Sequence, residues 1–342
     1  MQSCTQRTLA AARVTDDVVR MTGLAFVFPG QGSQSVGMGH DLVAVSTAAA
    51  AIFADADAAI GEPLSRLAWG GPAEDLNRTE NAQPALLAAS MAYLMVLGER
   101  VAAAGRPALR PSFLAGHSMG QYSALVASGA VSLAVGVRLV RERGRLMQAS
   151  GAGRDGAMAA VIGLDETAVP VLVERASAHG RFGVANRNAP GQLVVSGERP
   201  AIEAAVDIGR ELGAKRVIVL PVSVAAHSPL MAEAAAGMRA VLADADIRDP
   251  AIPLLANSDA HRIDTAGACR AELVEHLTAG VDWVRAVETM TAAGVDTFVE
   301  VGPGKVLTNL IKRIAPEASA VALDDPDGID RLTATAIAAA TT

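Results

Sequence analysis

The sequence predicts an α/β fold in two parts: a large domain with a mostly parallel sheet and a small α+β domain inserted into it. Hydrophobic residues make up 51% of the 342 residues and aromatic residues only 3%. This composition favours helices packed on a sheet through small side chains over an aromatic-rich sandwich. Short apolar runs that end in glycine-containing turns alternate with longer apolar stretches, which is typical of buried strands followed by helices.

The large domain begins at Leu24–Phe28, an apolar run that predicts a buried strand ending at Pro29. We expect a buried helix over 83–97, with Pro84 in its first turn. A second strand is expected at 111–115. Ser132 is a favourable N-cap for a later helix. The remaining expected elements of this domain are helices at 121–128, 133–148, 229–243, 271–277, 283–293 and 306–314, and strands at 252–256 and 297–301.

The small domain begins after the glycine-containing residues 151–153, where the pattern of expected strands and helices changes. Strands are expected at 157–162, 183–185, 192–196 and 215–220, with helices at 166–177 and 200–212. This β-α-β-β-α-β order is the ferredoxin-like arrangement. We therefore divide the chain into an N-terminal extension (1–20), a core (21–152 and 222–330), a small subdomain (153–221) and a C-terminal tail (331–342).

Charge and cysteine content exclude several classes of function. The formal charge is −7 and the isoelectric point about 5.4, with no basic tract among aromatics, so nucleic acid is not an expected partner. Cys4 and Cys269 are too few for a disulfide framework or a cysteine-rich zinc site, and the six histidines lack metal-ligand spacing. We expect no metal, no membrane and a cytoplasmic location. The long uncharged stretch at 112–136 is interpreted as a buried strand, turn and helix.

The pentapeptide GHSMG at 116–120 lies between an expected strand and an expected helix and matches G-x-S-x-G. Flanking glycines allow a sharp turn that exposes the Ser118 hydroxyl at a helix N-terminus, where the helix dipole favours developing negative charge. The pattern predicts a serine nucleophile, although a glycine-rich turn can also serve packing alone.

A serine nucleophile needs a base, and histidine is the usual one. His117 adjoins the serine, but neighbouring side chains on a tight turn diverge. His227 follows an expected strand, precedes a helix and has small neighbours that permit close approach of another segment. Composition alone leaves His227 open between a catalytic base and a structural histidine. The other four histidines are His40, His179, His261 and His276.

Two further features would suit acyl chemistry. The amide of Met119 could stabilise an oxyanion, and the glycine-rich loop around Gln31 could supply a second amide, although a simple turn explains that loop equally well. A cluster of arginines lies on the helix after the nucleophile helix. One of them could face inward and bind a carboxylate, but their spacing does not choose among Arg138, Arg141, Arg143 and Arg145.

Taken together, seven motifs resemble those of malonyl-CoA:acyl carrier protein transacylases and the related acyltransferases of polyketide synthases. The resemblance extends from about residue 24 to 314, with the motifs in the family's order and spacing. They are FVFPGQGSQSVGMG, TENAQPALLA, AGHSMGQYSAL, RERGRLMQ, NRNAPGQLVVSG, VSVAAHSPLM and FVEVGPGKVLTNLIKRI. The resemblance implies a hydrolase-like α/β core with a ferredoxin-like subdomain.

The resemblance also implies roles for individual residues. Ser118 would be the nucleophile, His227 its base, and the amides of Gln31 and Met119 the oxyanion hole. Arg143, the arginine directly before the glycine of R-G-x-x-M, would hold the malonyl carboxylate, with His117 helping. The expected partners are malonyl-CoA and an acyl carrier protein or carrier domain. No cofactor is expected, because coenzyme A arrives as a thioester substrate and the carrier brings the phosphopantetheine. We expect a monomer.

Three departures from the family pattern bear on this assignment. His276 stands where relatives often carry a glutamine whose carbonyl orients the catalytic histidine, and Gly280 replaces the usual proline. A backbone carbonyl would survive this substitution and a side-chain carbonyl would not. Gln121 stands where glutamate is common. Residues 224–226, Val-Ala-Ala, match neither usual specificity pattern, and the small Ala226 leaves room for a substituted malonyl group.

Two other functions remain open from the sequence. A thioesterase or proofreading acyl hydrolase would use the same Ser118 and His227 with water as the acceptor, although it would have no need of Arg143. A non-catalytic scaffold would need none of these side chains, so the complete set argues against it. The sequence does not distinguish fatty-acid from polyketide synthesis, nor malonyl from larger extender units.

Overall fold

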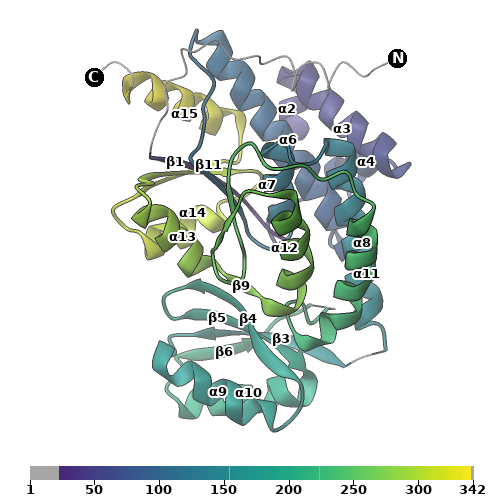
Figure 1. Cartoon of the computed structure of the whole chain (residues 1–342), viewed down its shortest axis with the longest axis vertical. Coiled ribbons are helices and arrows are strands. Elements are labelled where there is room, and N and C mark those ends of the chain that lie inside the picture. The colour runs from purple at the N-terminus through teal and green to yellow at the C-terminus, as the bar shows by residue number, and fades with distance from the viewer. Residues whose placement is uncertain (1–22, 154, 223, 340–342) are drawn as a thin grey trace.

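The computed structural model describes residues 23–153, 155–222 and 224–339. The expected extension at 1–20 and Cys4 lie outside them. The chain forms two sheets with helices around them (Figure 1). The first sheet has six strands in the order β11-β10-β1-β2-β7-β8. Its strands are β1 (Leu24–Phe28), β2 (Phe113–Gly116), β7 (Leu254–Leu255), β8 (Arg262–Ile263), β10 (Thr297–Val301) and β11 (Ser319–Leu323).

The first sheet is parallel except at its β7–β8 edge. Side chains of β1 alternate between two hydrophobic cores: Leu24, Phe26 and Phe28 enter one, and Ala25 and Val27 enter the other. Both faces of the strand are therefore buried, which explains its continuous apolar sequence. One core is lined by α6 (Thr79–Ala103) and its neighbours, and the other by α13 (Trp283–Ala292) and α14 (Val306–Ile314).

In the part of the chain that the structure describes, twelve helices surround the first sheet, most of them on the side of α6. They are α2 (His40–Val45), α3 (Thr47–Ile60), α4 (Leu64–Gly70), α5 (Ala73–Leu76), α6 (Thr79–Ala103), α7 (Gly120–Ala127), α8 (Leu133–Gly151), α11 (Ala232–Ala243), α12 (Ala266–Ala279), α13 (Trp283–Ala292), α14 (Val306–Ile314) and α15 (Pro326–Ala339). A short 3₁₀ turn, η2 (Pro229–Met231), precedes α11. The helix α15 includes residues 331–339, which the sequence analysis assigned to a tail.

The helix α6 begins four residues before its expected start, so Pro84 lies in the second turn instead of the first. A proline there cannot donate to the carbonyl of Glu80. Instead, the Arg141 side chain donates to that carbonyl at 3.0 Å. By length and composition α6 could span a membrane, but 67% of its most apolar window is buried in the protein. This burial is what a central core helix requires.

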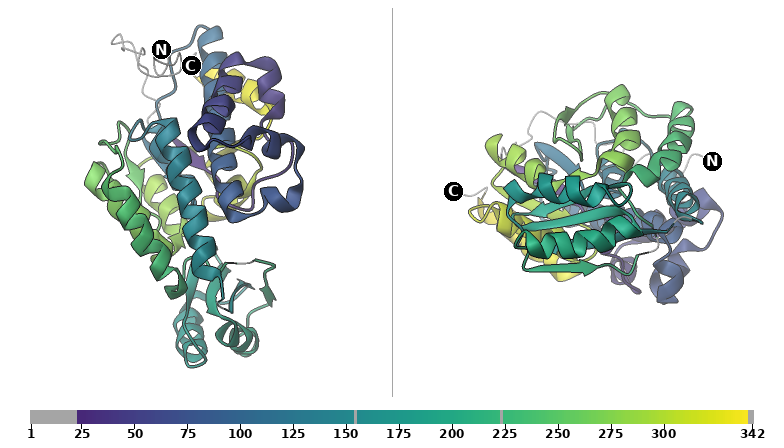
Figure 2. Two further views of the ribbon diagram at one scale, coloured as in Figure 1. Left: turned by 90° about the vertical axis from the view of Figure 1, so that its right-hand side faces the viewer. Right: turned by 90° about the horizontal axis from the view of Figure 1, so that it is seen from below.

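The second sheet has five strands in the order β6-β3-β5-β4-β9. Four antiparallel strands come from one continuous segment, and β9 joins β4 in parallel from much later in the chain. Two helices cover one face of this sheet and enclose a third core (Figure 2). The elements are β3 (Gly156–Ile162), η1 (Glu166–Ala168), α9 (Val169–Ser177), β4 (Phe182–Ala189), β5 (Gln192–Glu198), α10 (Arg199–Glu211), β6 (Arg216–Val219) and β9 (Val281–Asp282).

Candidate active site

Ser118 lies on a sharp turn between β2 and α7. Its backbone has a φ of 53°, in the left-handed region that non-glycine residues seldom adopt. The turn closes tightly on β1, because a Cβ on Gly120 would approach the carbonyl oxygen of Phe28 to 2.2 Å. Glycine at this position therefore permits the close approach that brings the serine to the carboxyl end of the sheet.

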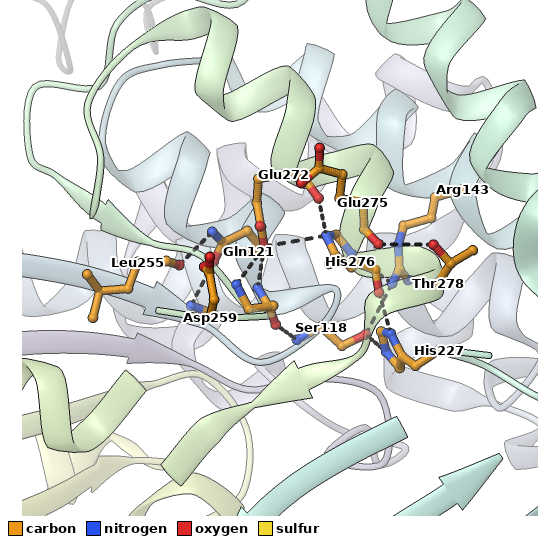
Figure 3. Close-up of polar contacts among 12 residues, drawn as sticks. Ser118, Gln121, Arg143, His227, Leu255, Asp259, Glu272, Glu275, His276 and Thr278 are labelled. Carbon is orange, nitrogen blue, oxygen red and sulfur yellow. Dashed lines mark hydrogen bonds and ion pairs between the residues drawn. The ribbon is translucent and has the colours of Figure 1, made fainter. Parts of the chain in front are cut away.

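His227 comes from the loop between β6 and α11 and is buried. Its Nε2 lies 2.8 Å from Ser118 Oγ, and its Nδ1 lies 2.6 Å from the backbone carbonyl oxygen of His276. A carbonyl can only accept, so Nδ1 carries the proton and Nε2 is free to accept one from the serine hydroxyl. Because the backbone supplies this contact, a histidine at position 276 leaves it intact (Figure 3).

Arg143 is the arginine of the cluster on α8 that faces inward, with a relative exposure of 1%. Its Nη2 lies 3.1 Å from Ser118 Oγ and 3.2 Å from His276 Nε2, and its Nη1 donates to Gln83 Oε1 at 2.8 Å. A Cβ on Gly144 would approach Cα of Glu80 to 2.6 Å, so α8 and α6 lie in close contact there. This close packing sets the guanidinium beside Gln83 and the serine.

Two backbone amides near the serine are free to bind an anion. The amides of Gln31 and Met119 donate to no acceptor in the part of the chain that the structure describes. Gln31 follows β1, whose last carbonyl, at Phe28, accepts from the His117 amide at 3.0 Å. The loop and the turn are thus held together at the strand end. Met119 precedes the first residue of α7, where the helix dipole adds to the attraction for negative charge.

A cavity of about 610 Å³ opens onto these groups from between the two sheets. One side of the cavity carries Ser118 and Arg143 from the elements around the first sheet, together with His227 from the end of the loop after β6. The other wall is mostly apolar and comes from the second sheet and the loop after it. Its residues include Met158, Val194, Leu220, Val224 and Ala226. The same wall also carries the polar side chains of Asn186, Asn188 and Gln192, so the cavity combines polar groups around the serine with a far wall that is mainly, but not wholly, apolar.

Burial keeps the histidines of the site uncharged. Desolvation, aided by the positive charge of Arg143, lowers the pKa of His227 to about 3. The same two causes hold the pKa of His276 well below its ordinary value, and burial lowers the pKa of His117. Burial also lowers the pKa of Arg143. A neutral His227 beside a serine hydroxyl is the state that a general base requires.

Comparison with protein families agrees with this geometry. The model of a family described as the acyl transferase domain matches residues 25–324. The chain belongs to the acyl transferase domain family. The acyltransferase is 43% identical over 309 residues to the malonyl CoA-acyl carrier protein transacylase of Escherichia coli strain K12, covering 90% of this chain and 98% of that protein.

Solved structures are similarly close to the acyltransferase. The malonyl-CoA:acyl carrier protein transacylase of Xanthomonas oryzae pv. oryzae superposes with a TM-score of 0.87 at 41% identity, covering 93% of this chain and 99% of the other. The malonyl-transacylase PlMCAT, solved with AntF, the acyl-carrier protein of a type II polyketide synthase, gives 0.87 at 39% identity, covering 91% and 99%.

The acyltransferase brings most of the expected site residues together. Ser118, His227, Arg143 and His276 form one connected group. His117 is not part of this hydrogen-bonded group: its Nε2 lies 2.9 Å from Asn188 Oδ1, and both residues line the cavity. The remaining histidines lie outside the group. His261, for example, pairs with Asp259 at 2.6 Å.

Three residues of the site were missed by sequence reasoning: Gln83, Asn257 and Glu272. Gln83 holds Arg143, Asn257 accepts from the Ser118 amide, and Glu272 holds Asn257. A signal existed for Asn257, which directly follows an expected strand at 252–256. Polar residues after parallel strands gather at the carboxyl edge of the sheet, where the GHSMG turn also lies. No such signal marks Glu272, which sits inside a helix.

The departures at 276 and 280 have distinct structural outcomes. His276 keeps the backbone contact to His227 and adds a side-chain contact to Arg143. Gly280 ends α12 with a φ of 90°, which proline cannot adopt. Among the described residues, no group of three or more histidine, cysteine, aspartate or glutamate side chains is arranged to hold a metal ion.

Proposed function

We propose that the acyltransferase transfers a malonyl group from coenzyme A to the phosphopantetheine thiol of an acyl carrier protein, through an ester on Ser118. The names of its relatives support the overall reaction. One observation carries the choice of substrate: a buried guanidinium lies beside the serine and has no acidic partner among the described residues. Arg143 contacts Gln83, Ser118 and His276, and within the same residues its Nε has no hydrogen-bond partner.

An unpaired buried cation is costly unless a ligand completes it. In the described parts of the chain, no carboxylate lies within ion-pairing distance of Arg143. The far carboxylate of a malonyl group on Ser118 is only three bonds from Oγ, and Arg143 Nη2 lies 3.1 Å from Oγ. A guanidinium so close can take the carboxylate in a two-pronged hydrogen bond. An acetyl group would leave the cation unpaired.

Acylation follows from the contacts around Ser118. As Oγ attacks the thioester carbonyl carbon, its proton passes to Nε2 of His227, 2.8 Å away. The His276 carbonyl steadies the imidazolium through Nδ1. The oxyanion is stabilised by the free amides of Gln31 and Met119. The carbon–sulfur bond then breaks, and the proton on His227 passes to the departing thiolate, so coenzyme A leaves as a thiol.

Transfer reverses these steps with the carrier thiol in place of coenzyme A. His227 takes the thiol proton, sulfur attacks the ester carbon, and the proton returns to Ser118 Oγ as the carbon–oxygen bond breaks. No cofactor enters either half-reaction. The apolar wall of the cavity would accept the pantetheine arm of both thiols. His117 would help Arg143 to contact the malonyl carboxylate, since it lines the same cavity.

The fold assignment rests on topology. We propose that residues 21–152 and 222–330 form a hydrolase-like core and that 153–221 form a ferredoxin-like subdomain. The order β6-β3-β5-β4, with α9 and α10 on one face, supports the second part. The short strand β9 extends this sheet from the core. We further propose a monomer in the cytoplasm, with the carrier protein as its macromolecular partner.

The test mixes the acyltransferase with malonyl-CoA and a carrier protein bearing phosphopantetheine, and reads both proteins by intact-mass spectrometry. Malonylated carrier is the expected product. Free malonate with an unmodified carrier would contradict transfer and favour a hydrolase. The Ser118→Ala variant is the control: it should give neither acyl-enzyme nor malonylated carrier.

A further inference from the structure

His276 lies in the last turn of α12, fully buried between Glu272 and Arg143 (Figure 3). Its Nδ1 is 2.9 Å from the backbone carbonyl oxygen of Glu272. Because that oxygen can only accept, the ring proton is on Nδ1 and the lone pair is on Nε2. The helix thus fixes both the orientation and the tautomer of this imidazole.

The lone pair of His276 faces the cation of the site. Nε2 is 3.2 Å from Arg143 Nη2, and a guanidinium has donors only. Gln83 Oε1 accepts from the other terminal nitrogen at 2.8 Å. Two neutral acceptors on α6 and α12 therefore hold the guanidinium from different sides while leaving its charge unneutralised. The ring of Tyr122, 5.9 Å from the guanidinium carbon, adds a third contact.

The residue at 276 supports the site in two separable ways. Its backbone carbonyl holds the base His227, and any side chain at this position would preserve that contact. Its imidazole contacts Arg143 instead. A substitution at 276 should therefore disturb the guanidinium more than the base.

We propose that the His276 side chain is a positioning residue that holds Arg143 for a carboxylate-ending acyl group, and so contributes to selection of malonyl over uncharged acyl chains. This inference rests on the proposed function. Burial and the charge of Arg143 keep the pKa of His276 well below its ordinary value, so the ring stays neutral and can accept.

The test measures kcat/KM for malonyl-CoA and acetyl-CoA in wild type, His276→Leu, His276→Asn and His276→Gln. Losing a hydrogen bond to a charged group should lower kcat/KM for malonyl-CoA about 10- to 100-fold in the Leu variant. For acetyl-CoA we expect a change of less than about threefold, since the backbone contact to His227 persists. Asparagine carries its amide near the position of Nδ1 and should behave like leucine. Glutamine reaches the position of Nε2 and should restore malonyl transfer.

Equal losses for both substrates in the Leu and Asn variants would overturn the inference, as would failure of glutamine to restore selectivity. If His276→Leu does not fold, the selectivity for malonyl-CoA in His276→Gln compared with His276→Asn is sufficient to test the role of the His276 side chain. A wild-type enzyme without preference for malonyl-CoA would contradict the proposed function instead. A selective wild type whose preference survives both His276→Leu and His276→Asn would contradict only the role of His276.

Discussion

The side-chain oxygen of Asn257 accepts a hydrogen bond from the backbone amide of Ser118 at 2.8 Å. Asn257 is itself held by Glu272 Oε1, which accepts from its backbone nitrogen at 2.7 Å and its side-chain nitrogen at 3.0 Å. Ser118 thus sits at the end of a buried chain of hydrogen bonds that starts on α12. This chain supports the left-handed backbone of Ser118, and the neighbouring Met119 amide stays free for its proposed role in binding the oxyanion.

Replacing Asn257 with leucine should destabilise the protein and slow acylation. The change leaves the Ser118 amide buried without its acceptor, at a cost of about 1–3 kcal/mol. It also removes one of the two hydrogen bonds to Glu272 Oε1, while the bond from the backbone nitrogen of residue 257 remains. Urea unfolding and single-turnover acylation measure the two effects. The exposed Asn309→Leu on α14 is the control and should change neither. An Asn257→Leu enzyme with wild-type stability and acylation rate would show that this contact has no supporting role.

Glu272 should make stability depend on pH. Burial raises its pKa from 4.5 to about 7. The folded state therefore holds the proton more tightly than the unfolded state, and the stability that this contributes is lost as pH rises from about 4.5 through about 7. A glutamine at 272 stays neutral at every pH. The free energy of unfolding of Glu272→Gln, relative to wild type, should therefore rise by on the order of 3 kcal/mol across this pH window.

Unfolding of wild type and Glu272→Gln at about pH 5 and about pH 8 measures this difference. The control is Glu275→Gln, which removes the same charge from an exposed position on the same helix and should show little pH-dependent gain. A Glu272→Gln variant with an equal effect at both pH values would refute the assignment of a raised pKa.

Arg143→Leu should impair transfer of malonyl far more than transfer of acetyl. Leaving the substrate carboxylate without its partner costs about 2–5 kcal/mol, which is about 30-fold to several-thousand-fold in kcat/KM. Steady-state kinetics with both thioesters check this result. Arg145→Leu, on the same helix but exposed, should retain near wild-type values. Equal losses for both thioesters in Arg143→Leu would argue for a purely structural role.

The rate of acylation should be insensitive to acid over a wide range. Burial and the charge of Arg143 lower the pKa of His227 to about 3, so the free enzyme holds this base deprotonated well below neutrality. A plot of kcat/KM for malonyl-CoA, which reports groups of the free enzyme, should stay flat from about pH 8 to about pH 5. An acidic limb centred near the ordinary histidine pKa of about 6.5 would contradict a buried neutral base.

Sequence reasoning located the parts of the site that depend on local chain geometry. Ser118 lies between a strand and a helix as expected, and β1, β10 and α14 have their expected bounds. Hydrogen bonds made by uncharged side chains to segments far away in the sequence could not be predicted in this way. Gln83 lies in the TENAQPALLA motif, but only the close packing of α6 on α8 gives its side chain a partner.

Strand β9 illustrates a second limit of prediction from sequence. It has two residues and pairs with β4, which lies about a hundred residues earlier in the chain. No local sequence pattern therefore predicts this strand. The early start of α6 has a similar origin. The carbonyl that Pro84 leaves free is satisfied by Arg141 on another helix, and this tertiary contact allows proline in the second turn.

Trapping the acyl-enzyme tests directly whether Ser118 carries the malonyl group. Wild type, exposed briefly to equal amounts of malonyl-CoA and acetyl-CoA without carrier, is digested and mapped by mass spectrometry. We expect one malonyl group, on Ser118, with little acetyl. Malonyl on another residue, or an unselective mixture on Ser118, would contradict it.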